Sequence, residues 1–168
     1  KWYVSSIYKI YYDVSPTVDN TIPTRTSGPI GVFVAVTPWN DPLLIACWQF
    51  APALATGNSV ILKPAEHSPL SALRIAELAI EAGMPEGVFN VVPGFGPPAG
   101  KALGMPMDVD KLGFTGSTEV GRYFLSYSGH SNMKRVSIAC GGQATNILFA
   151  DAPDLEQAAT RAADGRFG

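Results

Sequence analysis

The amino-acid sequence predicts an α/β fold in which a mostly parallel sheet carries helices on both faces. Short apolar runs rich in Val, Ile, Leu and Phe recur along the chain without polar alternation. Strands that are covered on both faces have this character. Helix-forming stretches separate the runs, with short connections between them. Such alternation indicates right-handed βαβ units, whose strands end along one edge of the sheet.

The composition limits the classes of protein and of partner. The chain has 168 residues, of which 46% are hydrophobic and 15% are charged. It is therefore long enough for one domain with a real core and is not typical of a disordered protein. A net charge of −2, with no basic cluster, argues against nucleic acid as a partner. No signal peptide opens the sequence, and no apolar run approaches the ~20 residues that span a bilayer. We therefore expect no membrane partner and a cytoplasmic location.

The two cysteines, Cys47 and Cys140, lie in apolar surroundings without the spacing of a metal site. We expect both to be buried free thiols in a reducing compartment, and we expect no metal ion.

The first 29 residues precede the repeating pattern. Tyr3, Ile7, Ile10 and Tyr11 recur at helical spacing, which predicts an amphipathic helix over residues 2–12 within a leading segment, 1–14. Its aromatic stripe is interpreted as packing surface rather than a ligand site. Residues 15–29 are polar, β-branched and interrupted by prolines. They are expected to form an exposed edge hairpin, a candidate oligomerisation segment.

The pattern after residue 29 predicts each element in turn. The expected strands are residues 30–36, 59–64, 88–92, 111–114, 134–140 and 146–149. The expected helices are residues 43–54, 69–82, 99–103, 118–127 and 155–163. Thr56, Gly57 and Asn58 are expected to close the first of these helices, and Gly83 to end the second.

Polar and glycine residues follow four of the expected strands. They are Asn40, then Lys63 and Glu66, then Gly94 and Gly96, and finally Gly116 and Ser117. Ligands of parallel sheets bind beyond the carboxyl ends of the strands, so this convergence predicts a nucleotide or dinucleotide site.

Residues 112–121 contain the last of these strand ends. They are expected to form a strand, a Gly-Ser turn and the start of a helix, and the N-terminus of a helix favours an anionic ligand. An ordinary turn in which Ser117 or Thr118 caps the helix is the alternative. The stretch lacks both the G-x-G-x-x-G pattern and the Walker lysine.

Four motifs, in their order and spacing, resemble the NAD(P)-dependent aldehyde dehydrogenase superfamily. They are GPIGV at 28–32, TPWN at 37–40, GNSVILKPAE at 57–66 and FTGSTEVG at 114–121. The stretches MKRV at 133–136 and ATNILFAD at 144–151 are most similar to the branch that oxidises amino-aldehydes such as γ-glutamyl-γ-aminobutyraldehyde.

The resemblance implies a Rossmann-type NAD-binding domain over residues 30–143 and the start of a catalytic domain over residues 144–168. The family oxidises an aldehyde to the acid and forms homo-oligomers, here a dimer or tetramer. In its mechanism a cysteine thiolate attacks the aldehyde, hydride passes to nicotinamide, and a base-activated water releases the acid.

The resemblance also implies roles for individual residues. Asn40 matches the asparagine that donates to the oxyanion of the intermediate, and its alternative role is an ordinary turn residue. Lys63 and Glu66 match the residues that hold the adenosine ribose. The alternative interpretation is that the two side chains form an ion pair in solvent and bind no ligand. Glu66 would repel a 2′-phosphate, which predicts NAD over NADP.

Other matches concern the rest of the cofactor. Gly96, Pro98 and Gly100 match the loop beside the adenine, with Val120 beneath the ring, while Gly116 and Ser117 match the pyrophosphate contact. The full expected cofactor set is Thr37, Pro38, Trp39, Lys63, Pro64, Ala65, Glu66, Gly96, Pro98, Gly100, Phe114, Thr115, Gly116, Ser117 and Val120.

Two departures from the family pattern bear on activity. Ala139 occupies the position of the family's general-base glutamate, and Gln143 that of a lysine. Loss of a general base commonly costs ~10²–10⁴ in rate. The motif of the nucleophilic cysteine would start where this chain ends, and Cys47 and Cys140 do not match it. We therefore expect this chain to be inactive on its own. A non-catalytic structural or binding relative, and an enzyme that transfers the acyl group to another acceptor, are the alternatives.

Overall fold

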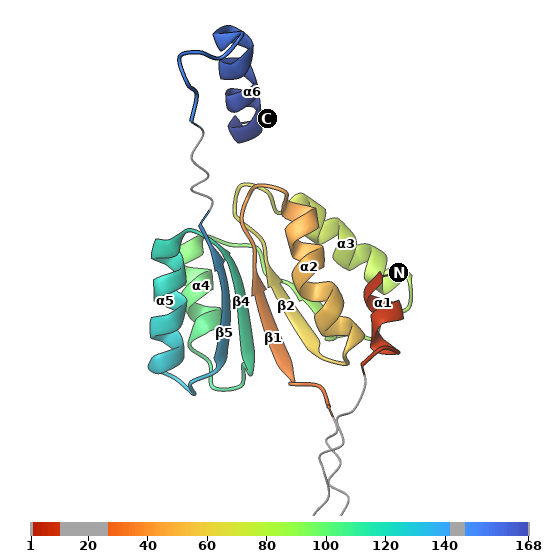
Figure 1. The fold of residues 1–168 in the computed structure, drawn as a ribbon. Coiled ribbons are helices and arrows are strands. Elements are labelled where there is room, and N and C mark those ends of the chain that lie inside the picture. Colours follow the sequence, from red (N-terminus) through yellow and green to blue (C-terminus); the bar gives the residue numbers. More distant parts are fainter. Residues whose placement is uncertain (1, 11–26, 142–146, 168) are drawn as a thin grey trace, which may run out of the picture.

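The computed structural model describes residues 2–10, 27–141 and 147–167 (Figure 1). Its centre is a five-stranded sheet of order β3-β2-β1-β4-β5, in which every pair is parallel. The strands are β1 Val32–Val36, β2 Ser59–Lys63, β3 Phe89–Val91, β4 Lys111–Gly116 and β5 Arg135–Cys140. The helices are α1 Trp2–Ile7, α2 Pro42–Ala55, α3 Leu70–Glu81, α4 Gly96–Gly104, α5 Thr118–Gly129 and α6 Leu155–Phe167. The predicted α/β class with a parallel sheet is confirmed.

Helices cover the sheet on both faces, with α2 and α3 on one side and α4 and α5 on the other (Figure 1). The central strand β1 shows why its run is apolar throughout. Phe33 and Ala35 join the core under α2 and α3, whereas Val34 and Val36 join the core under α4 and α5. Each face of β1 therefore contributes to a separate hydrophobic cluster, as expected for a strand buried on both sides.

The strand register aligns the ends of the strands. Val36 at the end of β1 pairs with Lys63 of β2 and with Phe114 of β4. Thr115 pairs in turn with Ala139 of β5. Residues that lie far apart in sequence therefore meet at the carboxyl edge of the sheet.

Several expected helix ends are confirmed. Thr56 is the C-cap of α2, and Gly57 follows with φ +82°. Gly83 follows α3 with φ +87°, a left-handed conformation that glycine adopts without strain. Ser117 caps α5, because its Oγ accepts a hydrogen bond from the Val120 N–H at 3.3 Å.

Other expected bounds are wrong. The leading helix ends at Ile7 rather than at residue 12, and residues 11–12 lie outside the described residues. The expected hairpin over residues 15–29 also lies there, except for residues 27–29, which form no strand. Helix α4 begins at Gly96 rather than at residue 99, with Pro97 and Pro98 in its first turn. Proline fits there because the first N–H groups of a helix have no intrahelical partner.

The expected sixth strand over residues 146–149 is also wrong. Residues 147–149 have no strand structure, and Asn146 lies outside the described residues. The side chains of Ile147 and Phe149 are 69% and 71% exposed. No described strand lies beside them, so the apolar pattern has no partner with which to form a ladder.

The expectation that both cysteines are buried fails for Cys140. Cys47 is half-buried and Cys140 is exposed, and both are free thiols. Cys140 is the last residue of β5, which is an edge strand with a neighbour on one side only. Among the helices of the described ranges, none is long and apolar enough to cross a membrane.

Candidate nucleotide-binding site

A hollow of about 890 Å³ lies beyond the carboxyl ends of the strands. Its walls come from the ends of β1, β2, β4 and β5, from the loops after β1 and β2, from Ile45 of α2, and from the first two turns of α4 and α5. The expected site residues that line it are Thr37, Pro38, Trp39, Asn40, Lys63, Ala65, Glu66, Gly96, Gly100, Phe114, Thr115, Gly116, Ser117, Val120 and Ala139. Three expected residues do not line it: Pro64, which is fully buried, Pro98, which is exposed on α4, and Gly94, which follows β3.

Lys63 is the buried cation of this hollow. Its side chain is 3% exposed, its Nζ donates to the Pro64 carbonyl at 3.0 Å, and it lies 3.8 Å from Glu66 Oε2. Burial lowers the pKa of the Lys63 ammonium, and the nearby Glu66 carboxylate opposes part of that shift. An ammonium has three N–H donors, and the described residues accept only one of them. Two donors therefore remain for ligand hydroxyls in the hollow.

The loop after β1 is tied to the loop after β2. The Thr37 N–H donates to the Lys63 carbonyl at 3.1 Å, and the Ser68 hydroxyl donates to the Trp39 carbonyl at 3.2 Å. The Thr37 hydroxyl is buried and has no hydrogen-bond partner within the described ranges. Because buried hydroxyls are normally satisfied, this group is suited to a ligand atom in the hollow.

Asn40 is exposed at the mouth of the hollow. The next residue, Asp41, has φ +45°, a left-handed conformation that few residues other than glycine adopt. This bend separates Asn40 from α2, which starts with Pro42, and leaves the Asn40 side chain outside the helix. The carboxamide is an uncharged group that can donate hydrogen bonds.

The turn between β4 and α5 brings backbone close to the hollow. A Cβ atom at Gly116 would lie 2.6 Å from Cζ of Phe114, so a side chain does not fit there. The Ser117 hydroxyl caps α5, and further N–H groups of its first turn remain unpaired, as at every helix start. This end of the helix therefore favours a negative group.

Beside this turn the hollow has an apolar wall between α4 and α5. Gly100, Val120 and Phe124 line it. Gly100 has no side chain, and an added Cβ would lie 3.5 Å from the Phe124 ring. No side chain projects from Gly100 into this part of the hollow.

At the end of β5, none of the described residues that line the hollow has a titratable side chain. Ala139 presents a methyl group there, and the titratable residues of the lining are Lys63, Glu66 and His67. His67 lines the hollow although no motif of the sequence predicted a role for it; its position directly after Glu66 is the available signal. The other lining residues that the sequence did not predict are Val36, Ile45, Pro97, Thr118, Phe124 and Gly141.

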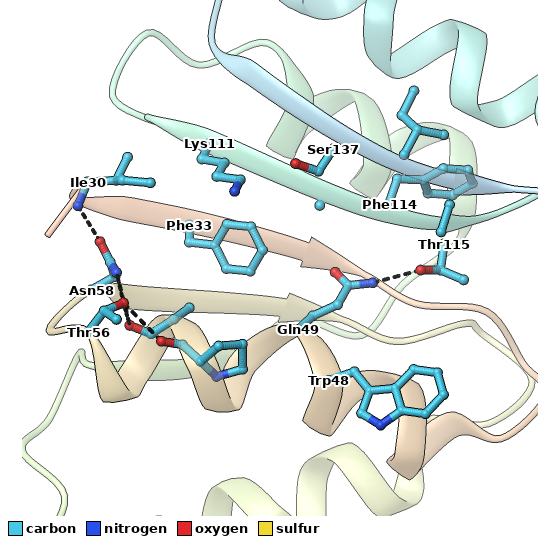
Figure 2. Close-up of a pocket in the computed structure, with 15 residues that line it drawn as sticks. Ile30, Phe33, Trp48, Gln49, Thr56, Asn58, Lys111, Phe114, Thr115 and Ser137 are labelled. Carbon is cyan, nitrogen blue, oxygen red and sulfur yellow. Dashed lines mark hydrogen bonds between the residues drawn. The ribbon is translucent and has the colours of Figure 1, made fainter. Parts of the chain in front are cut away.

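Figure 2 shows a second hollow, lined by residues of α2 and of the strands β1, β4 and β5. Its volume is about 440 Å³. Trp48 and Phe33 line it, and Lys111 places its Nζ 5.9 Å from the centre of the Phe33 ring. Gln49 donates from Nε2 to Thr115 Oγ1 at 3.1 Å (Figure 2). Thr115 lines both hollows, so this hydrogen bond stabilises the wall between them.

Comparison with known proteins identifies the family. The aldehyde dehydrogenase family model matches residues 1–168. The NADP/NAD-dependent aldehyde dehydrogenase PuuC of Escherichia coli is 53% identical over 167 residues, which cover 99% of this chain and 34% of PuuC. Several solved structures share the fold, among them the following two. The indole-3-acetaldehyde dehydrogenase AldA of P. syringae, in complex with NAD+, has a TM-score of 0.86 at 54% identity, covering 97% of this chain and 33% of AldA. The γ-glutamyl-γ-aminobutyraldehyde dehydrogenase of Burkholderia cenocepacia has a TM-score of 0.84 at 51% identity, covering 96% and 33%.

These findings confirm the predicted family and the predicted resemblance to the amino-aldehyde branch. The chain spans about a third of the length of the relatives that it matches. With a family match over all 168 residues and about half of its residues identical to those of these relatives, this chain belongs to the aldehyde dehydrogenase family.

Proposed function

We propose that this chain is the cofactor-binding part of an NAD-dependent aldehyde dehydrogenase that oxidises an amino-aldehyde to the acid. The observation that carries the proposal is the hollow at the carboxyl edge of the sheet. It combines a buried ammonium that has free donors, a nearby carboxylate and an unpaired helix start. A dinucleotide offers hydroxyls, a pyrophosphate and planar rings, which match these features in kind.

Lys63 and Glu66 are assigned to the adenosine ribose. Lys63 would donate to a ribose hydroxyl, and Glu66 would accept from the 2′- and 3′-hydroxyls. A 2′-phosphate beside Glu66 would meet a like charge, so we propose that NAD binds more tightly than NADP. Ser117 and the first turn of α5 would hold the pyrophosphate, and the wall formed by Gly100 and Val120 would hold the adenine. NAD, when bound, supplies the hydride acceptor.

Asn40 is assigned to the substrate end of the hollow. Its amide would donate to the oxygen of the reacting aldehyde carbon as negative charge develops there. Removing one such donor typically costs ~10²–10³ in rate. This assignment concerns a longer protein that also supplies the nucleophile.

We propose that this chain alone does not oxidise aldehydes. Neither cysteine lines the hollow. Burial also raises the pKa of the Cys47 thiol, which disfavours the thiolate needed for attack. The Ala139 methyl group cannot accept a proton from water, so hydrolysis of an acyl-enzyme would lack its base. Ala139 is also the observation that favours the alternatives, a non-catalytic relative or an enzyme whose acyl group passes to another acceptor.

The arrangement of the whole protein is also a proposal. We assign residues 30–143 to the NAD-binding domain, residues 144–168 to the start of a catalytic domain, and residues 15–29 to a contact within a homo-oligomer. A cytoplasmic location is part of the same proposal.

Calorimetric titration of the 168-residue chain with NAD and with NADP tests the cofactor assignment. Saturable binding of NAD, weaker binding of NADP, and loss of both in a Lys63→Ala, Glu66→Ala variant are the expected results. Circular dichroism of each protein shows whether it is folded. A folded chain that binds neither nucleotide would contradict the proposal and favour the non-catalytic alternative.

A further inference from the structure

Gln49 of α2 donates a hydrogen bond from Nε2 to Thr115 Oγ1, and Thr115 lines the hollow at the carboxyl edge of the sheet (Figure 2). We propose that Gln49 is a positioning residue for the cofactor, because its amide fixes the Thr115 hydroxyl as a hydrogen-bond donor to the bound dinucleotide. The inference rests on the proposed NAD site and adds a residue that does not itself line that site.

Two contacts determine the orientation of the Gln49 amide. Its Nε2 lies 3.1 Å from Thr115 Oγ1 and 3.5 Å from the Val36 carbonyl oxygen. A carbonyl oxygen can only accept a hydrogen bond, so the amide has to present its NH₂ group on this side rather than its own oxygen. Thr115 Oγ1 is therefore the acceptor in its hydrogen bond with Gln49.

The Thr115 hydroxyl keeps its own hydrogen for another partner. A hydroxyl has one O–H donor and two acceptor lone pairs, and the bond from Gln49 uses a lone pair. Within the described part of the chain, this hydroxyl makes no second hydrogen bond. A dinucleotide carries acceptors in its phosphates, riboses and carboxamide, so a cofactor bound in the hollow can accept this hydrogen.

Both partners of the bond lie on rigid elements. Helix α2 is held by Ala46 and Phe50, which are buried in the cluster that α2 shares with β1 and β2. Thr115 lies on β4, which pairs with β1 on one side and with β5 on the other. Groups on packed helices and paired strands are held more precisely than groups on loops. The fold therefore fixes the distance between the amide and the hydroxyl.

The carbonyl end of the Gln49 amide argues against a purely structural role. Gln49 Oε1 is buried and has no hydrogen-bond partner among the described residues. Leaving a buried acceptor unpaired lowers stability, and an apolar side chain of similar length would avoid that cost. Stability alone therefore does not account for a glutamine at this position, whereas donation to Thr115 does.

A double-mutant cycle on NAD affinity tests the inference. Calorimetry measures the dissociation constant of NAD for the 168-residue chain, for Gln49→Met, for Thr115→Val and for the variant with both substitutions. Methionine keeps the length of glutamine without its N–H donors, and valine keeps the shape of threonine without its hydroxyl. Each single substitution is expected to raise the dissociation constant about three- to tenfold, which corresponds to the loss of one uncharged hydrogen bond.

The double variant separates positioning from structural support. Because Gln49 acts through the Thr115 hydroxyl, the double variant is expected to bind NAD as weakly as Thr115→Val and no more weakly. A glutamine that only supported the structure would also contribute when the hydroxyl is absent, so the two effects would then multiply.

Two further variants complete the test. Gln49→Glu keeps the shape of glutamine, but its carboxylate accepts the hydroxyl hydrogen, so this variant is also expected to raise the dissociation constant. Gln157→Met is the matched control, because Gln157 is exposed on α6 and lines neither hollow. It is expected to bind NAD like the wild-type chain. Circular dichroism shows whether each variant is folded.

The outcomes separate the two proposals. With NAD bound by the wild-type chain, an unchanged constant in Gln49→Met or in Thr115→Val would overturn the role of Gln49 alone, as would multiplied effects in the double variant. If Gln49→Met is unfolded, an unchanged constant in Gln49→Glu would overturn it. A folded wild-type chain that does not bind NAD would overturn the cofactor site and the role of Gln49 together.

Discussion

Replacing Lys63 with methionine should separate binding from stability. Lys63 is 3% exposed, and its ammonium makes one hydrogen bond, to the Pro64 carbonyl. Burial lowers the pKa of this ammonium, so the folded chain holds the charge at a cost. Methionine fills a similar volume without that charge, and Glu66 keeps contact with water because it is 36% exposed. The free energy of unfolding should therefore change by less than about 1 kcal/mol.

Affinity for NAD should respond differently. Lys63 lines the hollow, and the one hydrogen bond that its ammonium makes among the described residues goes to the Pro64 carbonyl. A hydrogen bond that involves a charged group contributes about 1.5–3 kcal/mol. Losing about 2–3 kcal/mol would raise the dissociation constant of NAD roughly 30- to 150-fold. Urea denaturation followed by tryptophan fluorescence measures stability, and calorimetry measures affinity. Lys101→Met is the control, because Lys101 is exposed on α4 and does not line the hollow. Unchanged NAD affinity in Lys63→Met would refute the assigned role, and an unfolded variant would refute the energetic argument.

Three further predictions follow from packing and charge. Gly113→Val should lower the free energy of unfolding by about 1–3 kcal/mol in urea denaturation, because its Cβ would lie 2.8 Å from both the Phe33 ring and Gln49 Oε1; an unchanged midpoint would contradict the packing described. Burial lowers the pKa of the Lys63 and Lys134 ammonium groups in the folded chain. Between these lowered pKa values and about 10.4, the ordinary pKa of lysine, the unfolded chain therefore binds more protons than the folded chain. The free energy of unfolding should therefore rise with pH across this range. Urea midpoints measured at several pH values should rise less in Lys63→Met than in the wild-type chain. The last prediction concerns a longer relative that carries the nucleophile and has alanine at the position of Ala139. Replacing that alanine with glutamate should raise hydrolytic turnover in steady-state assays by ~10²–10⁴. An unchanged turnover would show that the missing base is not the defect.

The parts of the fold that the sequence predicted are those fixed by local chemistry. The unbroken apolar run of β1 indicates burial on both faces, and both faces of β1 are buried. Ser117 or Thr118 was expected to cap the helix, and the Ser117 hydroxyl accepts the Val120 N–H. The hollow also brings most of the expected cofactor residues together, because parallel strands end along one edge.

The errors arose where a residue depends on distant neighbours. Residues 147–149 have the composition of a strand, but a strand also needs a partner, and the described chain offers none. Cys140 follows an apolar stretch, yet its place at the end of an edge strand exposes it. Gln49 lies on a strongly apolar helix, and only the packed structure shows its hydrogen bond to Thr115.

The order of the strands also constrains how the chain folds. Val34 of β1 pairs with residue 61 of β2 and with residue 112 of β4. The cluster under α2 and α3 uses buried residues between 33 and 89 only, whereas the cluster under α4 and α5 also needs residues up to 124. On a ribosome, the first cluster can close while β4 is still being synthesised. Until β4 emerges, β1 has an unpaired edge and an uncovered apolar face, which makes such an intermediate prone to aggregation. Because β1 lies between β2 and β4, the nascent chain is exposed to aggregation for as long as the ribosome takes to proceed from β2 to β4.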